Sequence, residues 1–259
     1  MSYRHITVDP GDGVATVTMN RPERRNALSL EHMEELIAAL RALGASRARA
    51  VVLAGNGPVF CSGHDFGDMV ERDLAGMRRL FAVCAELMAT IQKIPQPVVA
   101  RVHGLATGAG CQLVATADLA VASTDARFAT PGGRGGWFCT TPMVAVSRAV
   151  GRKRALEMLL TGDEIDAATA AEWGLVNRVV AADRLDAETQ ALARAASRGS
   201  AAAKGAGKQA YYAQIDLDQA HAYAYASEVM AMMAFTADGR EAIRAFVEKR
   251  KAVFERGGE

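Results

Sequence analysis

The chain has 259 residues, of which 50% are hydrophobic and 23% are charged, and its formal net charge is +1. These values are ordinary for a globular protein with a sizeable core, and they give no electrostatic reason to expect nucleic acid or an anionic membrane as a partner. Residues 1–6 lack an apolar signal core, and no stretch approaches the ~18 apolar residues of a membrane span. We therefore expect a cytoplasmic protein with no membrane span.

The four cysteines, at positions 61, 84, 111 and 139, form no C-x-x-C pair and no metal-like cluster with histidine. This spacing favours reduced thiols and no metal site.

Short apolar runs alternate with helical patterns over the first 180 residues. Strands are predicted over residues 3–8, 14–19, 49–54, 97–103, 118–122 and 175–180, with a short extended piece at 128–131. Helices are predicted over residues 29–44, with Ser29 as the cap, and over 73–92, 142–150 and 152–160. From residue 183 onward the pattern is helical, most strongly over 217–235 and 240–254. This order predicts an α/β core, residues 1–195, and a C-terminal helical region, residues 196–259.

Two glycine-bearing turns follow apolar strands. One contains Ser62-Gly63-His64-Asp65, and the other runs from Gly104 to Gly110 and leads into a helical segment. A strand that feeds a helix through glycines leaves free backbone N–H groups beside a helix N-terminus, where negative charge is favoured. Tight packing alone would also explain the glycines. A dinucleotide site is disfavoured because the third glycine of G-x-G-x-x-G would fall on Leu113.

The chain resembles the crotonase, or enoyl-CoA hydratase/isomerase, superfamily. The matching segments, in chain order, are residues 20–28, 57–65, 104–113, 128–131, 160–176 and 245–250. The resemblance implies a spiral of ββα units with a C-terminal helical region that forms a trimer or a dimer of trimers. It also implies an acyl-CoA thioester as ligand, with CoA as part of the substrate and no separate cofactor.

The resemblance further implies which residues meet the ligand. The backbone N–H groups of His64 and Ala109 would hold the thioester oxygen as an oxyanion, while the His64 side chain would only line the pocket. The residues implied to contact CoA are Arg24, Arg25, Ala27, His64, Asp65, Phe66 and Gly67, with Phe246 and Lys249 reaching it from a neighbouring subunit. Solvated surface charge for the two arginines, and turn or helix capping for Asp65, are the alternatives.

The sequence departs from the family at the two glutamates that hydratases use. Gln112 stands where the first is expected, in the run Gly110-Cys111-Gln112-Leu113, and Gly132 stands where the second is expected. Neither residue can exchange a proton as a general base. Gln112 could hold a water molecule, and Thr140 lies near the position of an alternative acid in some members.

Two functions therefore stay open, together with a weaker third. The first is an enoyl-CoA hydratase-like lyase or isomerase of acyl-CoA or fatty-acid metabolism, with Gln112 and Thr140 as candidate catalytic residues. The second is a non-catalytic acyl-CoA-binding or regulatory protein, and the third is a protein that uses only the trimer scaffold. Acyl chain length would depend on the pocket around Trp137, Phe138 and the helix after Asp73.

Overall fold

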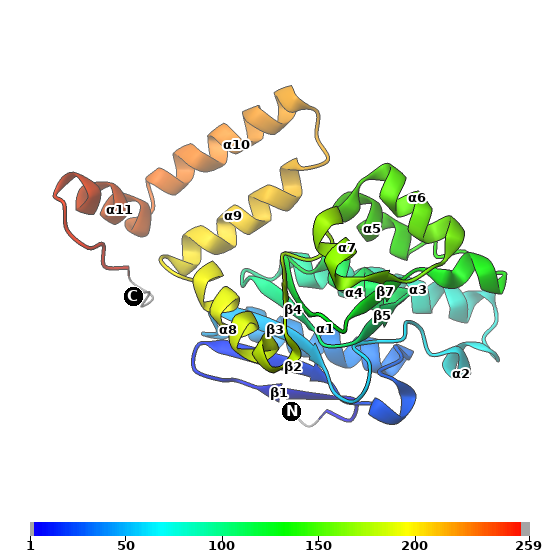
Figure 1. Ribbon diagram of the computed structural model, residues 1–259. Helices are drawn as coiled ribbons and strands as arrows, with labels where there is room; N and C mark the ends of the chain where they lie inside the picture. Colours follow the sequence, from blue (N-terminus) through cyan, green and yellow to red (C-terminus); the bar gives the residue numbers. More distant parts are fainter. Residues whose placement is uncertain (1–2, 255–259) are drawn as a thin grey trace.

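The computed structural model of the chain describes residues 3–254, and a six-stranded sheet lies at its centre (Figure 1). In spatial order the strands are β1 (Ile6–Asp9), β2 (Val14–Met19), β3 (Ala50–Gly55), β4 (Val98–Val102), β6 (Leu119–Ser123) and β9 (Arg178–Val180). The pair β1–β2 is antiparallel and all later pairs are parallel. The predicted α/β class is confirmed.

A second sheet of three short strands lies beside the first. It consists of β5 (Leu105–Thr107), β7 (Arg127–Ala129) and β8 (Ile165–Asp166), in the order β5-β7-β8. The sequence predicted an extended piece only at β7. The other two strands have two or three residues each, which is too short for an alternating apolar pattern in the sequence, and their pairing depends on tertiary contacts.

Helices cover both faces of the large sheet. In chain order they are α1 (Leu30–Gly44), α2 (Phe66–Met69), α3 (Leu74–Lys93), α4 (Ala109–Thr116), α5 (Pro142–Val150), α6 (Arg152–Thr161), α7 (Ala167–Trp173), α8 (Leu185–Ala196), α9 (Ala201–Gln214), α10 (Gln219–Ala234) and α11 (Ala237–Val247). Single turns of 3-10 helix lie at η1 (Pro22–Arg24), η2 (Pro131–Gly135) and η3 (Ala182–Arg184).

Strand β3 shows how the two faces are filled. Val51 and Leu53 belong to the core cluster under α1 and α3, whereas Val52 and Ala54 pack in a second cluster with residues of α8. Successive side chains of a strand point to opposite faces, so a strand with both faces covered is apolar throughout. Every residue of β3 is buried, as its continuous apolar run predicted.

The last predicted helix is too long. Helix α11 ends at Val247 instead of continuing to residue 254, and Lys249 takes a positive φ of 54° that breaks the helix. Arg250 then pairs with Glu241 of α11, and the Val253 N–H donates to the same carboxylate, 2.9 Å away. These contacts fold the chain back along its own helix, which helical periodicity cannot show.

Helices α10 and α11 project away from the sheet (Figure 1). Helix α10 buries none of its residues, and Met230, Phe235 and Phe246 are 76%, 74% and 84% exposed. An apolar surface of this kind on a described segment is typical of a protein interface. Across the described residues, no helix combines the length and apolarity needed to span a bilayer.

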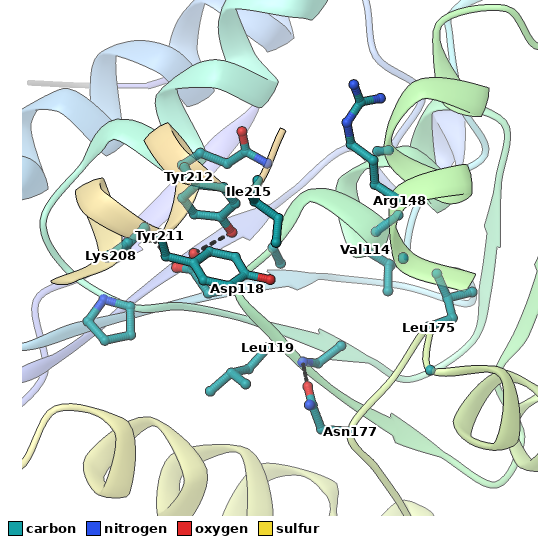
Figure 2. A pocket seen from close by; sticks show the side chains of 18 of the residues that line it. Val114, Asp118, Leu119, Arg148, Leu175, Asn177, Lys208, Tyr211, Tyr212 and Ile215 are labelled. Carbon is teal, nitrogen blue, oxygen red and sulfur yellow. Dashed lines mark hydrogen bonds and ion pairs between the residues drawn. The ribbon is translucent and has the colours of Figure 1, made fainter. Parts of the chain in front are cut away.

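Helix α9 is anchored to the core by a buried ion pair. Lys208 Nζ lies 2.6 Å from Asp118 Oδ2 and donates to the carbonyls of Ile91 and Gln96, each at 2.8 Å. The Tyr212 hydroxyl donates to Asp118 Oδ1 at 2.8 Å, as Figure 2 shows. Burial raises the pKa of Asp118 and lowers that of Lys208, so desolvation outweighs their mutual attraction.

These groups line a cavity of about 770 Å³ between α9 and the core, into which Leu119 and Arg148 also face (Figure 2). None of the residues predicted to bind or transform an acyl-CoA lines it.

Replacing Lys208 by Met should lower the free energy of unfolding by roughly 3–5 kcal/mol, because Asp118 would stay buried without its cation. Urea denaturation at one fixed protein concentration measures this. The control is Lys204→Met, on the same helix but exposed, which should change stability by less than about 0.5 kcal/mol. Equal effects of the two variants would show that the pair does not anchor α9.

Candidate active site

The turn formed by residues 61–65 is hydrogen-bonded to a backbone segment on each of its two sides. On one side the Leu28 N–H donates to the Gly63 carbonyl at 2.8 Å, and the Asp65 N–H donates to the Leu28 carbonyl at 3.1 Å. On the other side the Thr107 N–H donates to the Cys61 carbonyl at 3.0 Å. The N–H of His64 falls between these bonds and takes no part in them.

The second turn meets the first at Gly63. A Cβ atom on Gly63 would lie 3.0 Å from the Thr107 carbonyl oxygen and 3.3 Å from the Ala109 nitrogen, so only glycine allows this approach. Gly108 has φ 55° and ψ −119°, a conformation that favours glycine, and it starts α4 at Ala109. Among residues 3–254, neither the His64 N–H nor the Ala109 N–H has a hydrogen-bond acceptor.

Gln112 lies one turn further along α4 and is buried. Its Oε1 lies 3.8 Å from the Cys84 Sγ of α3, a weak thiol donor. Burial raises the pKa of Cys84, and also that of Cys111, to about 12, so both thiols stay protonated at neutral pH. The structure therefore places Gln112 beside the two turns with no titrating neighbour from α3.

Thr140 lies apart from these groups. It is exposed in the turn before α5, where its N–H donates to the Phe138 carbonyl at 2.8 Å. Within the described chain, no hydrogen bond joins Thr140 to Gln112 or to either turn. Its assignment as an acid rests on the family resemblance alone.

The loop around Gly132 has no room for a second glutamate. A Cβ on Gly132 would lie 2.2 Å from the Trp137 carbonyl oxygen and 2.8 Å from Cys139 Sγ. The Trp137 N–H donates to the Gly132 carbonyl at 2.9 Å, which closes the loop on itself. The main chain therefore occupies the space that a side chain at this position would need.

Aromatic rings form a wall next to the first turn. The His64 ring meets Phe81 edge to face with centroids 5.3 Å apart, Phe81 lies 5.6 Å from Trp137, and Trp137 lies 6.0 Å from Phe66. The sequence indicated Trp137 and the helix that carries Phe81 as determinants of the pocket. The resemblance also implied that the His64 side chain lines the pocket, and the structure places its ring against Phe81.

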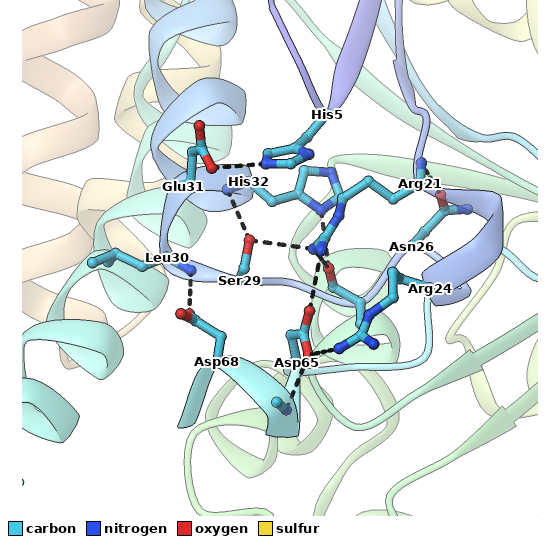
Figure 3. Close-up of polar contacts among 12 residues, drawn as sticks. His5, Arg21, Arg24, Asn26, Ser29, Leu30, Glu31, His32, Asp65 and Asp68 are labelled. Atoms are coloured by element: carbon cyan, nitrogen blue, oxygen red, sulfur yellow. Dashed lines mark hydrogen bonds and ion pairs between the residues drawn. The ribbon is translucent and has the colours of Figure 1, made fainter. Parts of the chain in front are cut away.

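The carboxylate of Asp65 is held by two arginines (Figure 3). Arg24 donates to its Oδ1 at 2.8 Å and Arg21 to its Oδ2 at 3.2 Å, while Oδ1 also accepts the Gly67 N–H and so caps α2. Burial opposes ionisation of Asp65, but the two guanidinium groups outweigh it and lower its pKa. The capping alternative is therefore what the structure shows, and Asp65 is not a free base.

The other residues implied to contact CoA fall into three groups. Ala27 is buried, and its carbonyl accepts a hydrogen bond from Arg21 at 2.9 Å. Phe66 and Gly67 are exposed on α2, and Arg25 is exposed with a positive φ of 51°. Phe246 lies in α11 and Lys249 comes directly after it, and α11 projects away from the sheet (Figure 1). Their contact with CoA stays a prediction about a neighbouring subunit.

Sequence reasoning missed Arg21, which bridges Asp65, the Ala27 carbonyl and the Ser29 hydroxyl. It appeared only as part of the family motif at residues 20–28. No group of three or more His, Cys, Asp or Glu within residues 3–254 is arranged to hold a metal ion.

The sequence model of the family described as enoyl-CoA hydratase/isomerase matches residues 9–257. The chain belongs to this family. A mitochondrial enoyl-CoA hydratase domain-containing protein 3 from Mus musculus is 42% identical over 247 residues, which cover 94% of this chain and 82% of the mouse protein. The corresponding Homo sapiens protein is 41% identical over 94% of this chain and 81% of its own length.

Solved structures of the enoyl-CoA hydratase/isomerase family have the same fold. A Mycobacterium smegmatis enoyl-CoA hydratase superposes with a TM-score of 0.93 at 46% identity, covering 96% of this chain and 98% of that one. The human domain-containing protein 3 gives a TM-score of 0.93 at 40% identity, covering 97% and 100%. The predicted crotonase-like fold and C-terminal helical region are confirmed, as is the resemblance to the enoyl-CoA hydratase/isomerase family.

Replacing Asp65 by Asn should lower the free energy of unfolding at pH 7 by about 1.5–3 kcal/mol, because two charge-assisted hydrogen bonds are lost while the cap is kept. The folded pKa of Asp65 is lowered below 3.8, so the contribution exists above pH 3.8 and disappears as pH falls through the folded pKa. Denaturation at pH 7, 5 and 3 should show the two proteins converging at acid pH. A constant difference at all three would contradict this role.

Replacing Gly132 by Ala should destabilise the chain by about 1–3 kcal/mol, because the new methyl group collides with the Trp137 carbonyl. Thermal unfolding measures the loss. Gly135→Ala is the matched control, since a Cβ there meets nothing within 4 Å. A stable Gly132→Ala protein would mean that the loop opens easily and could accept a glutamate.

Proposed function

We propose that this chain binds an acyl-CoA thioester and stabilises negative charge on the thioester oxygen with the N–H groups of His64 and Ala109. The observation that carries the proposal is the meeting of two turns whose N–H groups have no acceptor, at the N-terminus of α4. Donors fixed in advance toward a developing oxyanion contribute about 2.7–4 kcal/mol each to lowering a barrier. The family match supports the same reading.

The CoA portion would lie over the surface formed by Ala27 and residues 65–67. Main-chain groups there would meet the adenine and pantetheine, and Arg24 and Arg25 would face the phosphates. Arg24 already pairs with Asp65 and is half exposed, so it can bind a phosphate while it keeps the cap in place. Phe246 and Lys249 would reach the same CoA from a neighbouring copy.

For the reaction, we propose hydratase- or isomerase-like chemistry on an enoyl- or acyl-CoA of fatty-acid metabolism. Gln112 would position a water molecule, and Thr140 would have to move inward to act as an acid. Relatives described as probable enoyl-CoA hydratases, such as the one from Rhizobium meliloti, are 36% identical over 98% of this chain.

The alternative is a non-catalytic acyl-CoA-binding or regulatory protein. Two features favour it: Gln112 stands where the family resemblance implies an acid–base residue, and the loop at Gly132 has no room for a side chain. This alternative predicts binding with no product.

We also propose that the chain assembles into a trimer or a dimer of trimers through α10 and α11. The exposed apolar side chains of these helices supply the interface, and the proposed CoA contacts of Phe246 require such an assembly.

No cofactor beyond the substrate's own CoA is proposed. A cytoplasmic location is proposed as well, while the names of the mouse and human relatives assign those proteins to mitochondria.

Replacing Gly108 by Ala tests the oxyanion donors. A side chain disfavours φ 55°, so the Ala109 N–H should turn away and turnover of crotonyl-CoA, or of another enoyl-CoA in a chain-length panel, should fall about 10²–10³-fold. Calorimetry measures butyryl-CoA binding in parallel. Gly207→Ala on α9, where a Cβ meets nothing within 4 Å, is the control.

If the wild-type chain binds butyryl-CoA but turns over no enoyl-CoA, the result contradicts the enzymatic function and supports the non-catalytic, regulatory one. If it binds no CoA ester, the acyl-CoA site itself is excluded.

A further inference from the structure

The imidazole of His64 is a titratable group for which the family resemblance supplies no chemical role. Both of its ring nitrogens are buried and have no hydrogen-bond partner among residues 3–254. The other histidines each make at least one hydrogen bond, His5 to Glu31, His32 to Ala27, His103 to Gly57 and His221 to Asp218. A buried polar group without a partner is costly, so an unpaired ring in this site indicates a partner that arrives with the ligand.

The position of the ring is compatible with a role at the reacting carbon of a thioester. The ring packs on Phe81 of α3, and Cys84, one turn further along that helix, contacts Gln112. The ring and Gln112 therefore border the same helix one turn apart. A thioester oxygen bound to the His64 N–H would lie ~2.9 Å from that nitrogen, and C2 of the acyl group is two bonds from the oxygen. C2 would thus lie close to the residue that carries this side chain.

We infer that the His64 side chain is the acid–base group of this site and transfers the proton at C2 of the acyl-CoA, in place of the absent glutamates. In the enolisation step a ring nitrogen takes the C2 proton, the C–H electron pair forms the C1–C2 double bond, and the thioester oxygen receives the carbonyl electrons. The imidazolium returns a proton to C2 in the reverse step. In hydration the proton taken from the attacking water is the one delivered to C2, while the hydroxyl oxygen bonds to C3. The inference rests on the proposed function of the site.

The chemistry of the ring supports this role. Burial lowers the pKa of His64 to about 4, although the Leu28 carbonyl opposes the shift, and the ring then has the proton affinity of an ordinary carboxylate. The neutral ring would become an imidazolium beside the enolate, so the positive and negative charges formed in this step would lie next to each other.

Neighbouring titratable groups of the described chain do not compete for this role. The Cys84 and Cys111 thiols remain protonated, and Asp65 is engaged by Arg21 and Arg24 with a lowered pKa.

Substitution at position 64 separates the two functions of this residue, because any variant keeps the peptide N–H. The test uses the full-length protein and butyryl-CoA, with exchange of the C2 proton in D₂O followed by mass spectrometry and binding by calorimetry. His64→Phe should bind within about threefold of the wild type and lose exchange about 10²–10⁴-fold. His64→Gln, which forms hydrogen bonds but takes no proton, should be equally slow. The control His103→Gln should exchange at the wild-type rate.

The pH profile gives a second readout. Wild-type exchange should be constant above pH 5 and fall as His64 protonates near pH 4, above the pH at which Asp65 titrates. If either His64→Gln or His64→Phe exchanges the C2 proton within threefold of the wild-type rate, the inference is overturned. So would a wild-type chain that binds butyryl-CoA without exchange, while the binding site would stand. Failure to bind would remove the proposed function and this inference together.

Discussion

The close approach of two main-chain turns, at Gly63 and at Ala109, is the constraint on which the site depends. It requires a glycine at position 63, a left-handed glycine at position 108 and two backbone bridges, from Leu28 and from Ala106. None of these contacts involves a side chain that could itself react. The site is thus formed by the fold of the backbone, and neither Gln112 nor Gly132 takes part in these contacts.

The sequence predicted best the features that depend on local sequence patterns. The apolar run of β3 and the Ser29 cap of α1 both follow from local rules, and both are present. The two turns were predicted as glycine-bearing ends of strands, and their nearness in space was an inference from the family motifs. Parallel strands place their carboxyl ends at one edge of the sheet, which is the physical reason that the inference works.

Features that depend on one contact between distant residues were not predictable. Strand β8 has two residues and forms only against β7, and the chain turns back after α11 so that Arg250 pairs with Glu241. The aromatic wall brings together His64 and Phe81 from different elements. Such contacts leave no periodic pattern and no fixed spacing in the sequence, so only the folded structure shows them.

The closed loop at Gly132 has a consequence for how this chain can change. A single codon change could place a carboxylate at position 112, where a side chain already points inward, but none could do so at position 132 without moving the Trp137 peptide and Cys139. A site with carboxylates at both positions would therefore require a change in the main chain around Gly132 as well as the two substitutions. The closed loop thus favours an acid–base group from another position over a carboxylate at this one.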